Sequence, residues 1–290
     1  MSKTIQQLLQ SSKKINRLDA ELLIAHVLQK PREFVLSHPE YEISKLKNWQ
    51  ITNFFEKRFR GIPLAYLTKH KEFFGLEFFV NKNVLVPRPD TEILVESVIN
   101  HIHNSKFINH NSTIIDIGTG SGCIPISILK SLSTNQLANT QTFATDISKK
   151  ALRVAKKNAK RHDVKINFLH GNLLKPLLTN RSLITDHQSL VITANLPYLT
   201  EEQLKQEPSI QHEPRLALVA RESGLELYHK LLEQIQSLLI NHQLQLTAFF
   251  EIDPKQPKPI TKLIKKYLPN AKIEIKPDLA GLDRIVIIKT

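Results

Sequence analysis

Residues 114–122 have the sequence IIDIGTGSG, in which three isoleucines and one aspartate lead directly into three glycines spaced two apart. This pattern predicts a buried strand followed by a tight turn and a helix. Because glycine has no Cβ, the backbone of such a turn can approach a ligand closely, and sheets of this kind bind ligands at the carboxyl ends of their strands. The stretch therefore predicts an α/β fold with a binding site at Gly118, Thr119, Gly120, Ser121 and Gly122.

The glycine loop differs from three common motifs. Its GxGxG spacing lacks the third glycine of the dinucleotide fingerprint, and no Lys-Ser or Lys-Thr pair follows it, as a phosphate-binding loop would require. Gly120 also occupies the place where a nucleophile elbow would have serine.

Strand-like and helix-like patterns alternate from about residue 112 onward. This alternation predicts a Rossmann-like, mostly parallel sheet with helices on both faces. A short PDLAGL segment separates the last two strands and is too short for a helical crossover, so these two strands are expected to pair antiparallel. The seven strand candidates are STIIDI (112–117), QTFATD (141–146), KINFLH (165–170), SLVITA (189–194), LQLTAFFEI (244–252), AKIEIK (271–276) and DRIVIIK (283–289).

The remainder of the chain divides into two further parts. Residues 1–72 have helical apolar spacing and no strand pattern, which predicts a small all-helical domain. Residues 73–90 contain two short aromatic and branched runs around Asn81-Lys82-Asn83, which predicts a linking β-hairpin with its turn at those three residues. Residues 91–290 form the predicted α/β domain and begin with a helix that follows PRPD.

Composition and charge limit the function classes. The chain has 290 residues, 8 glycines, a single cysteine and a net charge of +13. It contains no run of about 18 apolar residues and no signal-like start, so we expect no membrane segment and a cytoplasmic location. Its lysines are scattered, which favours a solvated surface over a nucleic-acid interface. His101 and His103 are two apart on a predicted helix and Cys123 is alone, so no metal site is expected.

Polar residues at the ends of successive strands indicate the ligand. Asp146 ends the second predicted strand, where a carboxylate can accept from the two hydroxyl groups of a ribose. Gly171 and Asn172 end the third, where a small turn could approach an adenine edge. Each feature alone is also typical of a helix cap or a solvated turn. In this order they favour a nucleoside cofactor without a pyrophosphate.

The fourth predicted strand ends in Asn195-Leu196-Pro197-Tyr198. An isolated asparagine there would most simply be a turn former. Next to the predicted cofactor site, the Asn195 side-chain oxygen and a backbone carbonyl could accept the two hydrogens of a planar amide or aromatic amine and aim its nitrogen at an electrophile. Tyr198 could pack on the planar face. The nitrogen can lose its proton after methyl transfer from a sulfonium, so no strong base is needed.

Taken together, DIGTGSG, Asp146, Gly171-Asn172 and NLPY resemble the motifs of class I S-adenosylmethionine-dependent methyltransferases that act on exocyclic or amide nitrogen. More specifically, the chain resembles the peptide chain release factor glutamine methyltransferases, the PrmC or HemK family, over nearly its whole length. The segments that carry this resemblance are GIPLAYLTKHKEFFGLEF (61–78), VLVPRPDTEILVE (84–96), HEPRLALVARESGLELY (212–228), EIDPKQ and DLAGLDRIV.

The resemblance implies a function and a set of site residues. The cofactor would be S-adenosylmethionine, held by Gly118–Gly122, Asp146, Asn172, Leu173 and Asn195. The acceptor would be the glutamine of the Gly-Gly-Gln motif in release factors, bound by Asn195, Leu196, Pro197 and Tyr198, with the N-terminal domain recognising the protein. A monomer without a stable nucleic-acid partner is expected.

The chain departs from the family pattern in three places. Leu196 stands where the family usually has proline, Asn172 stands where it usually has aspartate, and the ALVARESGL stretch lacks a glycine pair. Three alternatives stay open: glutamine methylation of a ribosomal protein, N-methylation of a base amine in nucleic acid, and a non-catalytic RNA-binding module on the same fold.

Overall fold

The computed structural model describes residues 2–104, 112–180, 189–241 and 244–290, and the chain forms two compact units. The first unit comprises Met1–His70 and Glu207–His212, and the second comprises Lys71–Gln206 and Glu213–Thr290. Across the described ranges, no helix combines the length and the apolar character needed to cross a membrane.

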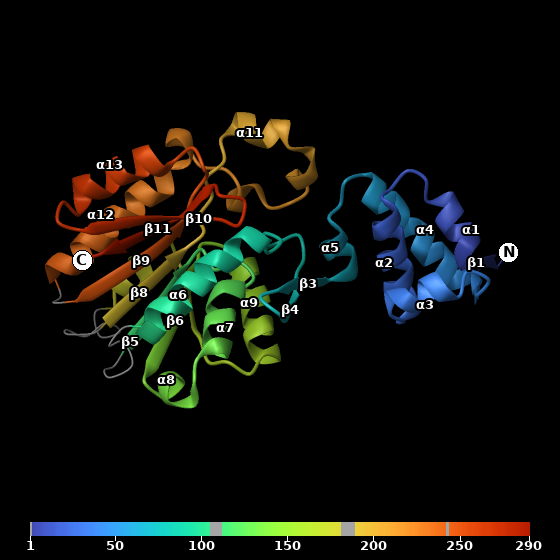
Figure 1. Cartoon of the computed structure of the whole chain (residues 1–290), viewed down its shortest axis with the longest axis horizontal. Helices are drawn as coiled ribbons and strands as arrows, with labels where there is room; N and C mark the ends of the chain where they lie inside the picture. The colour runs from blue at the N-terminus through green and yellow to red at the C-terminus, as the bar shows by residue number, and fades with distance from the viewer. Residues whose placement is uncertain (1, 105–111, 181–188, 242–243) are drawn as a thin grey trace. The chain divides into compact units, whose positions relative to one another are not determined.

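The first unit is built mainly from helices (Figure 1). They are α1 (Ile5–Ser11), α2 (Arg17–Leu28), α3 (Arg32–Ser37), α4 (Lys45–Phe59) and α5 (Leu64–Thr68). Local sequence fixes two of the helix starts, because Thr4 forms a capping box with Gln7 and the Asn16 side chain accepts from the backbone of Leu18. A buried apolar core that includes Leu8, Leu23, Ile24 and Ile51 holds the helices together.

The expectation of an all-helical first unit needs one correction. Two strands of two residues each, β1 (Lys3–Thr4) and β2 (Glu42–Ile43), pair antiparallel in this unit. Strands this short are below the length at which a period-two pattern can be seen, and they are paired by packing between distant segments.

The linking hairpin consists of β3 (His70–Phe73) and β4 (Leu76–Phe79), and its turn was predicted in the wrong place. The turn is Phe74-Gly75, where both residues have positive φ (52° and 68°), as a two-residue type I′ hairpin turn requires. The Phe74 N–H donates to Glu92 Oε1 at 2.9 Å, which helps to hold this unusual conformation. Asn81 instead forms a local turn, in which its side chain accepts from the Asn83 backbone at 2.9 Å.

The second unit contains the predicted seven-stranded sheet, in the order β10-β11-β9-β8-β5-β6-β7. The strands β7, β6, β5, β8 and β9 run parallel, and β11 is antiparallel to both β9 and β10, which confirms the expected pairing of the last two strands. The strands are β5 (Ser112–Ile117), β6 (Thr140–Asp146), β7 (Asn167–His170), β8 (Ser189–Ala194), β9 (Gln245–Glu251), β10 (Lys272–Pro277) and β11 (Asp283–Lys289).

Helices cover both faces of this sheet (Figure 1). On one side, α6 packs against α7 and β9, and α7 packs against α9. On the other side, α12 and α13 bury Tyr228, Leu232 and Ile260 in one apolar cluster with Ile115 and Ile117 of β5. The helices are α6 (Glu92–Asn104), α7 (Cys123–Ser131), α8 (Thr134–Ala138), α9 (Lys149–Arg161), α10 (Lys175–Leu178), α11 (Glu201–Gln206), α12 (Glu226–Asn241) and α13 (Pro257–Tyr267), with short 3-10 turns at Pro89–Thr91, Pro208–Ile210, Arg215–Ala217 and Glu222–Gly224.

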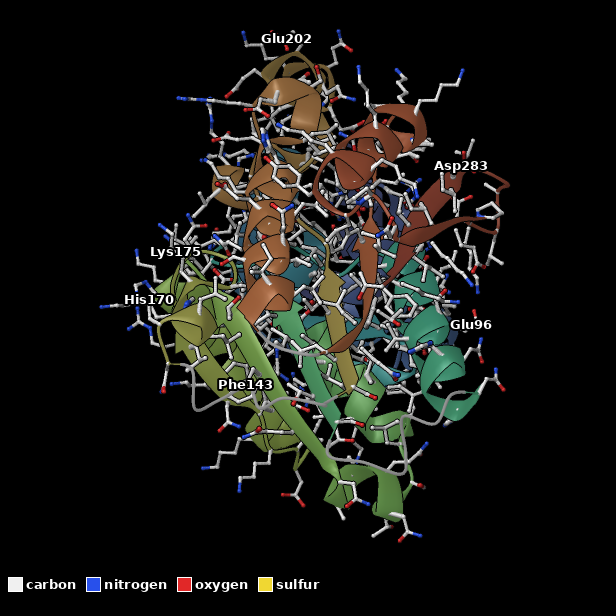
Figure 2. The ribbon with its side chains drawn as sticks, turned by 90° about the vertical axis from the view of Figure 1, so that its left-hand side faces the viewer. Glu96, Phe143, His170, Lys175, Glu202 and Asp283 are labelled. Atoms are coloured by element: carbon white, nitrogen blue, oxygen red, sulfur yellow. The ribbon has the colours of Figure 1, made fainter. Side chains whose placement is uncertain are left out.

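Burial of both sheet faces explains why branched apolar residues are frequent in the central strands β5 and β8, although Asp116 is also buried there. Every residue of β5 is buried, as expected for a parallel strand covered on two sides. In Figure 2, Phe143 lies on the sheet, whereas the exposed charged side chains of Glu96, Glu202 and Asp283 lie at the periphery of this unit.

Strand register decides which residues meet at the edge of the sheet. Ile117, the last residue of β5, pairs with Thr145 of β6 on one side and with Ala194 of β8 on the other. The segments that follow these strands therefore begin side by side, at the point where the chain order reverses around β5. Ligands bind at such a topological switch point in open α/β sheets.

Candidate active site

A cavity opens at this edge of the sheet, and most of the residues predicted from the sequence line it. Its walls include Gly118, Thr119, Gly120, Ser121, Asp146, Asn172, Leu173, Asn195, Leu196 and Pro197. Gly122 and Tyr198 are the two predicted residues that are not part of the lining.

The glycine loop is held by the neighbouring strand. Gly118, Gly120 and Gly122 have φ values of 71°, 54° and 81°, a region that residues with a side chain rarely adopt. The backbone N–H groups of Gly118 and Thr119 both donate to the carbonyl of Thr145, at 2.9 and 3.0 Å. The three glycines therefore serve the conformation of the loop itself.

Gly122 acts by close packing. A Cβ on Gly122 would lie 3.1 Å from Ile126 and 3.2 Å from the Ala155 side chain, so its absence allows α7 and α9 to approach each other. This explains why Gly122 is needed although it does not line the cavity.

Asp146 supports the loop and faces the cavity. Its Oδ2 accepts from the Gly120 N–H at 2.9 Å and its Oδ1 accepts from the Ser148 N–H at 2.7 Å. Burial raises the pKa of this carboxyl group, partly offset by those two hydrogen bonds. Since each carboxylate oxygen can accept more than one hydrogen bond, acceptor capacity is left for two further donors, such as the hydroxyl groups of a ribose.

The turn after β7 reaches the same cavity. Its position is fixed by the Gly171 N–H, which donates to the Asp146 carbonyl at 3.1 Å. A Cβ on Gly171 would lie 2.4 Å from Pro176, so only glycine fits there. Leu173 has a positive φ of 54°, and its side chain is buried in the core while the residue lines the cavity. Asn172 and Leu173 can therefore form an edge for a flat ring.

Asn195 follows β8 and presents its side-chain amide at the cavity. Its Nδ2 donates to Thr91 Oγ1 at 3.1 Å. No hydrogen bond to its Oδ1 occurs among the residues that the structure describes. The amide is therefore oriented with its oxygen available as an acceptor.

Two contacts hold Leu196 in place, at the position where the family usually has a proline. Its backbone N–H, which a proline would lack, donates to the Tyr228 hydroxyl at 3.3 Å. Its side chain is buried against the glycine loop, where a Cβ on Gly118 would lie 3.1 Å from Leu196 Cδ2. The loop is thus fixed at its backbone and at its side chain.

The segment after Pro197 is held by backbone pairing and by a close approach. Leu199 donates to the Leu218 carbonyl and accepts from Ala220, each at 3.0 Å. A Cβ on Gly224, whose φ is 84°, would lie 1.9 Å from the carbonyl oxygen of Tyr198. Gly224 is therefore required for the position of the loop.

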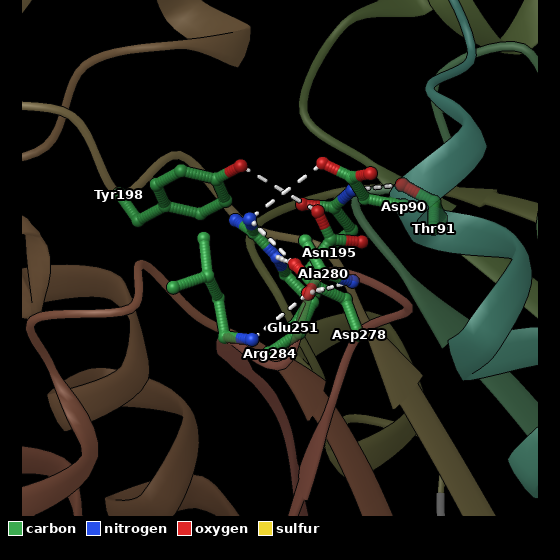
Figure 3. A network of polar contacts seen from close by, with 9 residues as sticks. Asp90, Thr91, Asn195, Tyr198, Glu251, Asp278, Ala280 and Arg284 are labelled. Carbon is green, nitrogen blue, oxygen red and sulfur yellow. Dashed lines mark hydrogen bonds and ion pairs between the residues drawn. The ribbon is translucent and has the colours of Figure 1, made fainter.

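Tyr198 points into a polar network beside the cavity (Figure 3). Its hydroxyl donates to Glu251 Oε1 at 3.5 Å, and burial together with the charge of Glu251 raises the pKa of Tyr198. Burial raises the pKa of Glu251 to about 7, while hydrogen bonding from Thr91 and the charge of Arg284 act in the opposite direction. Asp90 lies 3.6 Å from the guanidinium group of Arg284. Tyr198 thus contacts this network in the structure, and its packing on a substrate plane stays a prediction.

Four further residues of the site were not predicted from the sequence. Thr91 orients Asn195, Glu251 accepts from Tyr198, and Tyr228 holds Leu196. Glu213 accepts from the Val86 N–H at 2.8 Å and from the Arg88 guanidinium group. Val86 and Arg88 lie within the VLVPRPDTE segment, so the sequence marked this segment as part of the site. It did not show that Glu213 is the partner of these two residues.

Cys123 and the histidines of the described ranges are not grouped as metal ligands. No group of three or more His, Cys, Asp or Glu side chains in the described ranges is placed to hold a metal ion. Burial raises the pKa of the Cys123 thiol to about 12, so it remains protonated at neutral pH and behaves as a small apolar side chain.

Two protein families match parts of the chain. The PrmC N-terminal domain matches residues 1–68, and the ribosomal protein L11 methyltransferase family (PrmA) matches residues 98–199. The release factor glutamine methyltransferase of Bacillus anthracis is 34% identical over 268 residues, covering 92% of this chain and 90% of the relative. This chain belongs to the release factor glutamine methyltransferase family.

Other comparisons agree with this assignment. The release factor glutamine methyltransferase of Coxiella burnetii is 32% identical and covers 99% of this chain and 97% of the relative. The human Mettl16 catalytic domain, solved in complex with the MAT2A 3′UTR hairpin 1, has a TM-score of 0.56 with 15% identity, covers 92% of this chain and 90% of that one, and shows the fold alone. The predicted fold class, the family and the methyltransferase class are confirmed. Release factor glutamine methyltransferases depend on S-adenosylmethionine as methyl donor, as predicted.

Proposed function

We propose that this chain transfers the methyl group of S-adenosylmethionine to the side-chain amide nitrogen of the glutamine in the Gly-Gly-Gln motif of peptide chain release factors. The observation that carries the proposal is the amide of Asn195, whose nitrogen is occupied by Thr91 and whose oxygen remains an acceptor at a cavity shared with the glycine loop. Membership of the release factor glutamine methyltransferase family supports the same substrate.

The residues of the cavity fit the cofactor. Gly118 to Ser121 offer a backbone surface without bulky side chains, Asp146 has acceptor capacity for ribose hydroxyl groups, and Asn172 and Leu173 form an edge for the adenine. The bound cofactor supplies an electrophilic methyl group on a positively charged sulfur.

The loop after β8 prepares the acceptor nitrogen. A glutamine amide nitrogen is weakly nucleophilic because its lone pair is delocalised into the carbonyl group. Asn195 Oδ1 and the carbonyl of Leu196 accept its two hydrogens and hold it in the orientation for in-line attack. A nitrogen–carbon bond forms as the sulfur–carbon bond breaks, and the nitrogen then loses one proton, so the product is neutral N-methyl glutamine.

The helical first unit is proposed to recognise the release factor. Its match to the PrmC N-terminal domain over residues 1–68 supports this role. The cytoplasmic location, the monomeric state and the absence of a stable nucleic-acid partner stay predictions from the sequence.

Mass spectrometry tests the proposal directly. The chain is incubated with S-adenosylmethionine and a release factor, and one added methyl group is expected on the glutamine of Gly-Gly-Gln. A release factor with alanine in place of that glutamine is the matched control and should gain no methyl group. Methylation of a ribosomal protein or of RNA, with the release factor unmodified by a cofactor-binding enzyme, would overturn the proposal.

A further inference from the structure

Thr91 lies between the loop after β8 and a buried carboxylate. It ends the 3-10 turn Pro89–Thr91, is only 3% exposed, and lines the cavity together with Asn195. Its backbone N–H donates to the Arg88 carbonyl at 3.1 Å, which fixes its main chain independently of its side chain. The hydroxyl group is therefore free for interactions with other side chains.

The direction of the Asn195 amide follows from its hydrogen bond with this hydroxyl group. The amide nitrogen of Asn195 is a donor, and the hydroxyl oxygen of Thr91 can accept. It accepts from Asn195 Nδ2 at 3.1 Å (Figure 3).

This hydrogen bond decides which end of the Asn195 amide meets the substrate. With Nδ2 held by Thr91, Oδ1 is the atom available to the cavity. A rotated amide would instead present an N–H donor to the N–H groups of a glutamine side chain, and the two donors would repel each other. The orientation of Asn195 is therefore as important for the reaction as its presence.

We propose that Thr91 is a positioning residue that holds Asn195 with its Oδ1 turned toward the acceptor amide. The inference rests on the proposed function and extends it to a residue outside the loop after β8. Thr91 touches neither bond that changes in the reaction, so its removal should reduce turnover without preventing cofactor binding.

Two substitutions at Thr91 separate this role from packing. Thr91→Val keeps the branched shape and removes the hydroxyl group, whereas Thr91→Ser keeps the hydroxyl group. We expect kcat for release factor methylation to fall roughly tenfold in Thr91→Val, with KM and the Kd of S-adenosylmethionine changed by less than about twofold. Thr91→Ser should restore kcat to within about threefold of wild type.

A buried threonine without a polar role provides the matched control. Thr142 of β6 is 2% exposed, and its hydroxyl group has no hydrogen-bond partner in the described part of the chain. Thr142→Val removes the same group from the same unit and should leave kcat unchanged. Thermal unfolding of all three variants shows whether each is folded at the assay temperature.

The possible results discriminate between the two proposals. Wild-type turnover in Thr91→Val, or a loss that Thr91→Ser does not restore, would overturn the positioning role while the proposed function stands. A wild-type enzyme that binds cofactor but leaves the release factor unmethylated would overturn the proposed function and the positioning role with it.

Discussion

The backbone N–H of Leu196 donates a hydrogen bond of 3.3 Å to the phenolic oxygen of Tyr228. The same hydroxyl group donates to the carbonyl oxygen of Glu251, so Tyr228 connects the loop after β8 to the end of β9. The family's usual proline at position 196 would have no N–H for this contact. Compared with proline, leucine at this position lacks the rigid pyrrolidine ring but gains this hydrogen bond.

Tyr228→Phe should therefore destabilise this chain. It leaves the buried N–H of Leu196 without a partner, at a cost of about 1–3 kcal/mol in the free energy of unfolding. Denaturant unfolding measures the loss, and Tyr267→Phe on α13 is a control that should change stability much less. In the Leu196→Pro background, which lacks the N–H, Tyr228→Phe should cost less than in the wild type. Equal costs in both backgrounds would show that the Leu196 contact is not the cause.

Gly224→Ala should disrupt the loop after β8. A Cβ would lie 1.9 Å from the Tyr198 carbonyl oxygen, which requires that backbone to move. Gly281 provides a matched control, since its φ of 80° is similar but nothing lies within 4 Å of its added Cβ. Gly281→Ala should cost only the strain of a left-handed backbone, about 1–2 kcal/mol. Gly224→Ala should lose more stability than this in denaturant unfolding and most of the methyltransferase activity, and similar behaviour of the two variants would contradict the close approach.

Asp146→Asn should weaken cofactor binding. The substitution keeps the shape but replaces one acceptor oxygen by an N–H donor, which opposes either the Gly120 or the Ser148 backbone N–H. An unpaired buried donor costs about 1–3 kcal/mol, which corresponds to roughly a 5- to 150-fold rise in the Kd of S-adenosylmethionine. Calorimetric titration measures this Kd. An unchanged Kd would exclude Asp146 from the cofactor site.

The raised pKa of Glu251 predicts that the free energy of unfolding falls as the pH rises. Burial raises the pKa of its carboxyl group from 4.5 to about 7. Four neighbouring side chains act on this carboxyl group. Thr91 and Arg284 lower its pKa, whereas Asp90 raises it. Tyr198 donates a hydrogen bond to the carboxylate. The folded state therefore binds a proton more tightly than the unfolded state between these two pH values.

The contribution of Glu251 to stability is present below pH 4.5 and is lost as the pH rises through 7. The free energy of unfolding of Glu251→Gln should accordingly change less between pH 5 and pH 8 than that of the wild type, as measured by denaturant unfolding at several pH values. Glu233→Gln, an exposed position on α12, is the control and should follow the wild type. A Glu251→Gln profile parallel to the wild type would contradict the raised pKa.

Local sequence determined the sheet and the edge at which the site lies. The run at 114–117, which holds three isoleucines around Asp116, predicted a buried strand, and a parallel sheet places the ends of its strands at a common edge. Gly118, Asp146 and Asn195 each follow or end such a strand, so their convergence required only the parallel order of the strands. The register of β5 between β6 and β8 agrees with that expectation.

The tertiary structure decided the turn of the hairpin and the partners of the reacting loop. Asn81 is a better turn former by residue type than Phe74, but burial of Phe73 and Phe78 and the contact of Phe74 with Glu92 outweigh that local preference.

Thr91, Glu251 and Tyr228 lie between 32 and 104 residues from the loop residues that they contact or orient. Their roles depend on the pairing of β8 with β9 and on the packing of α6 against β9. Sequence alone predicted that Asn195 would lie at the site because a strand end has a fixed place in a parallel sheet. The direction in which its amide points depends on side chains brought there by packing, and only the folded structure specifies it.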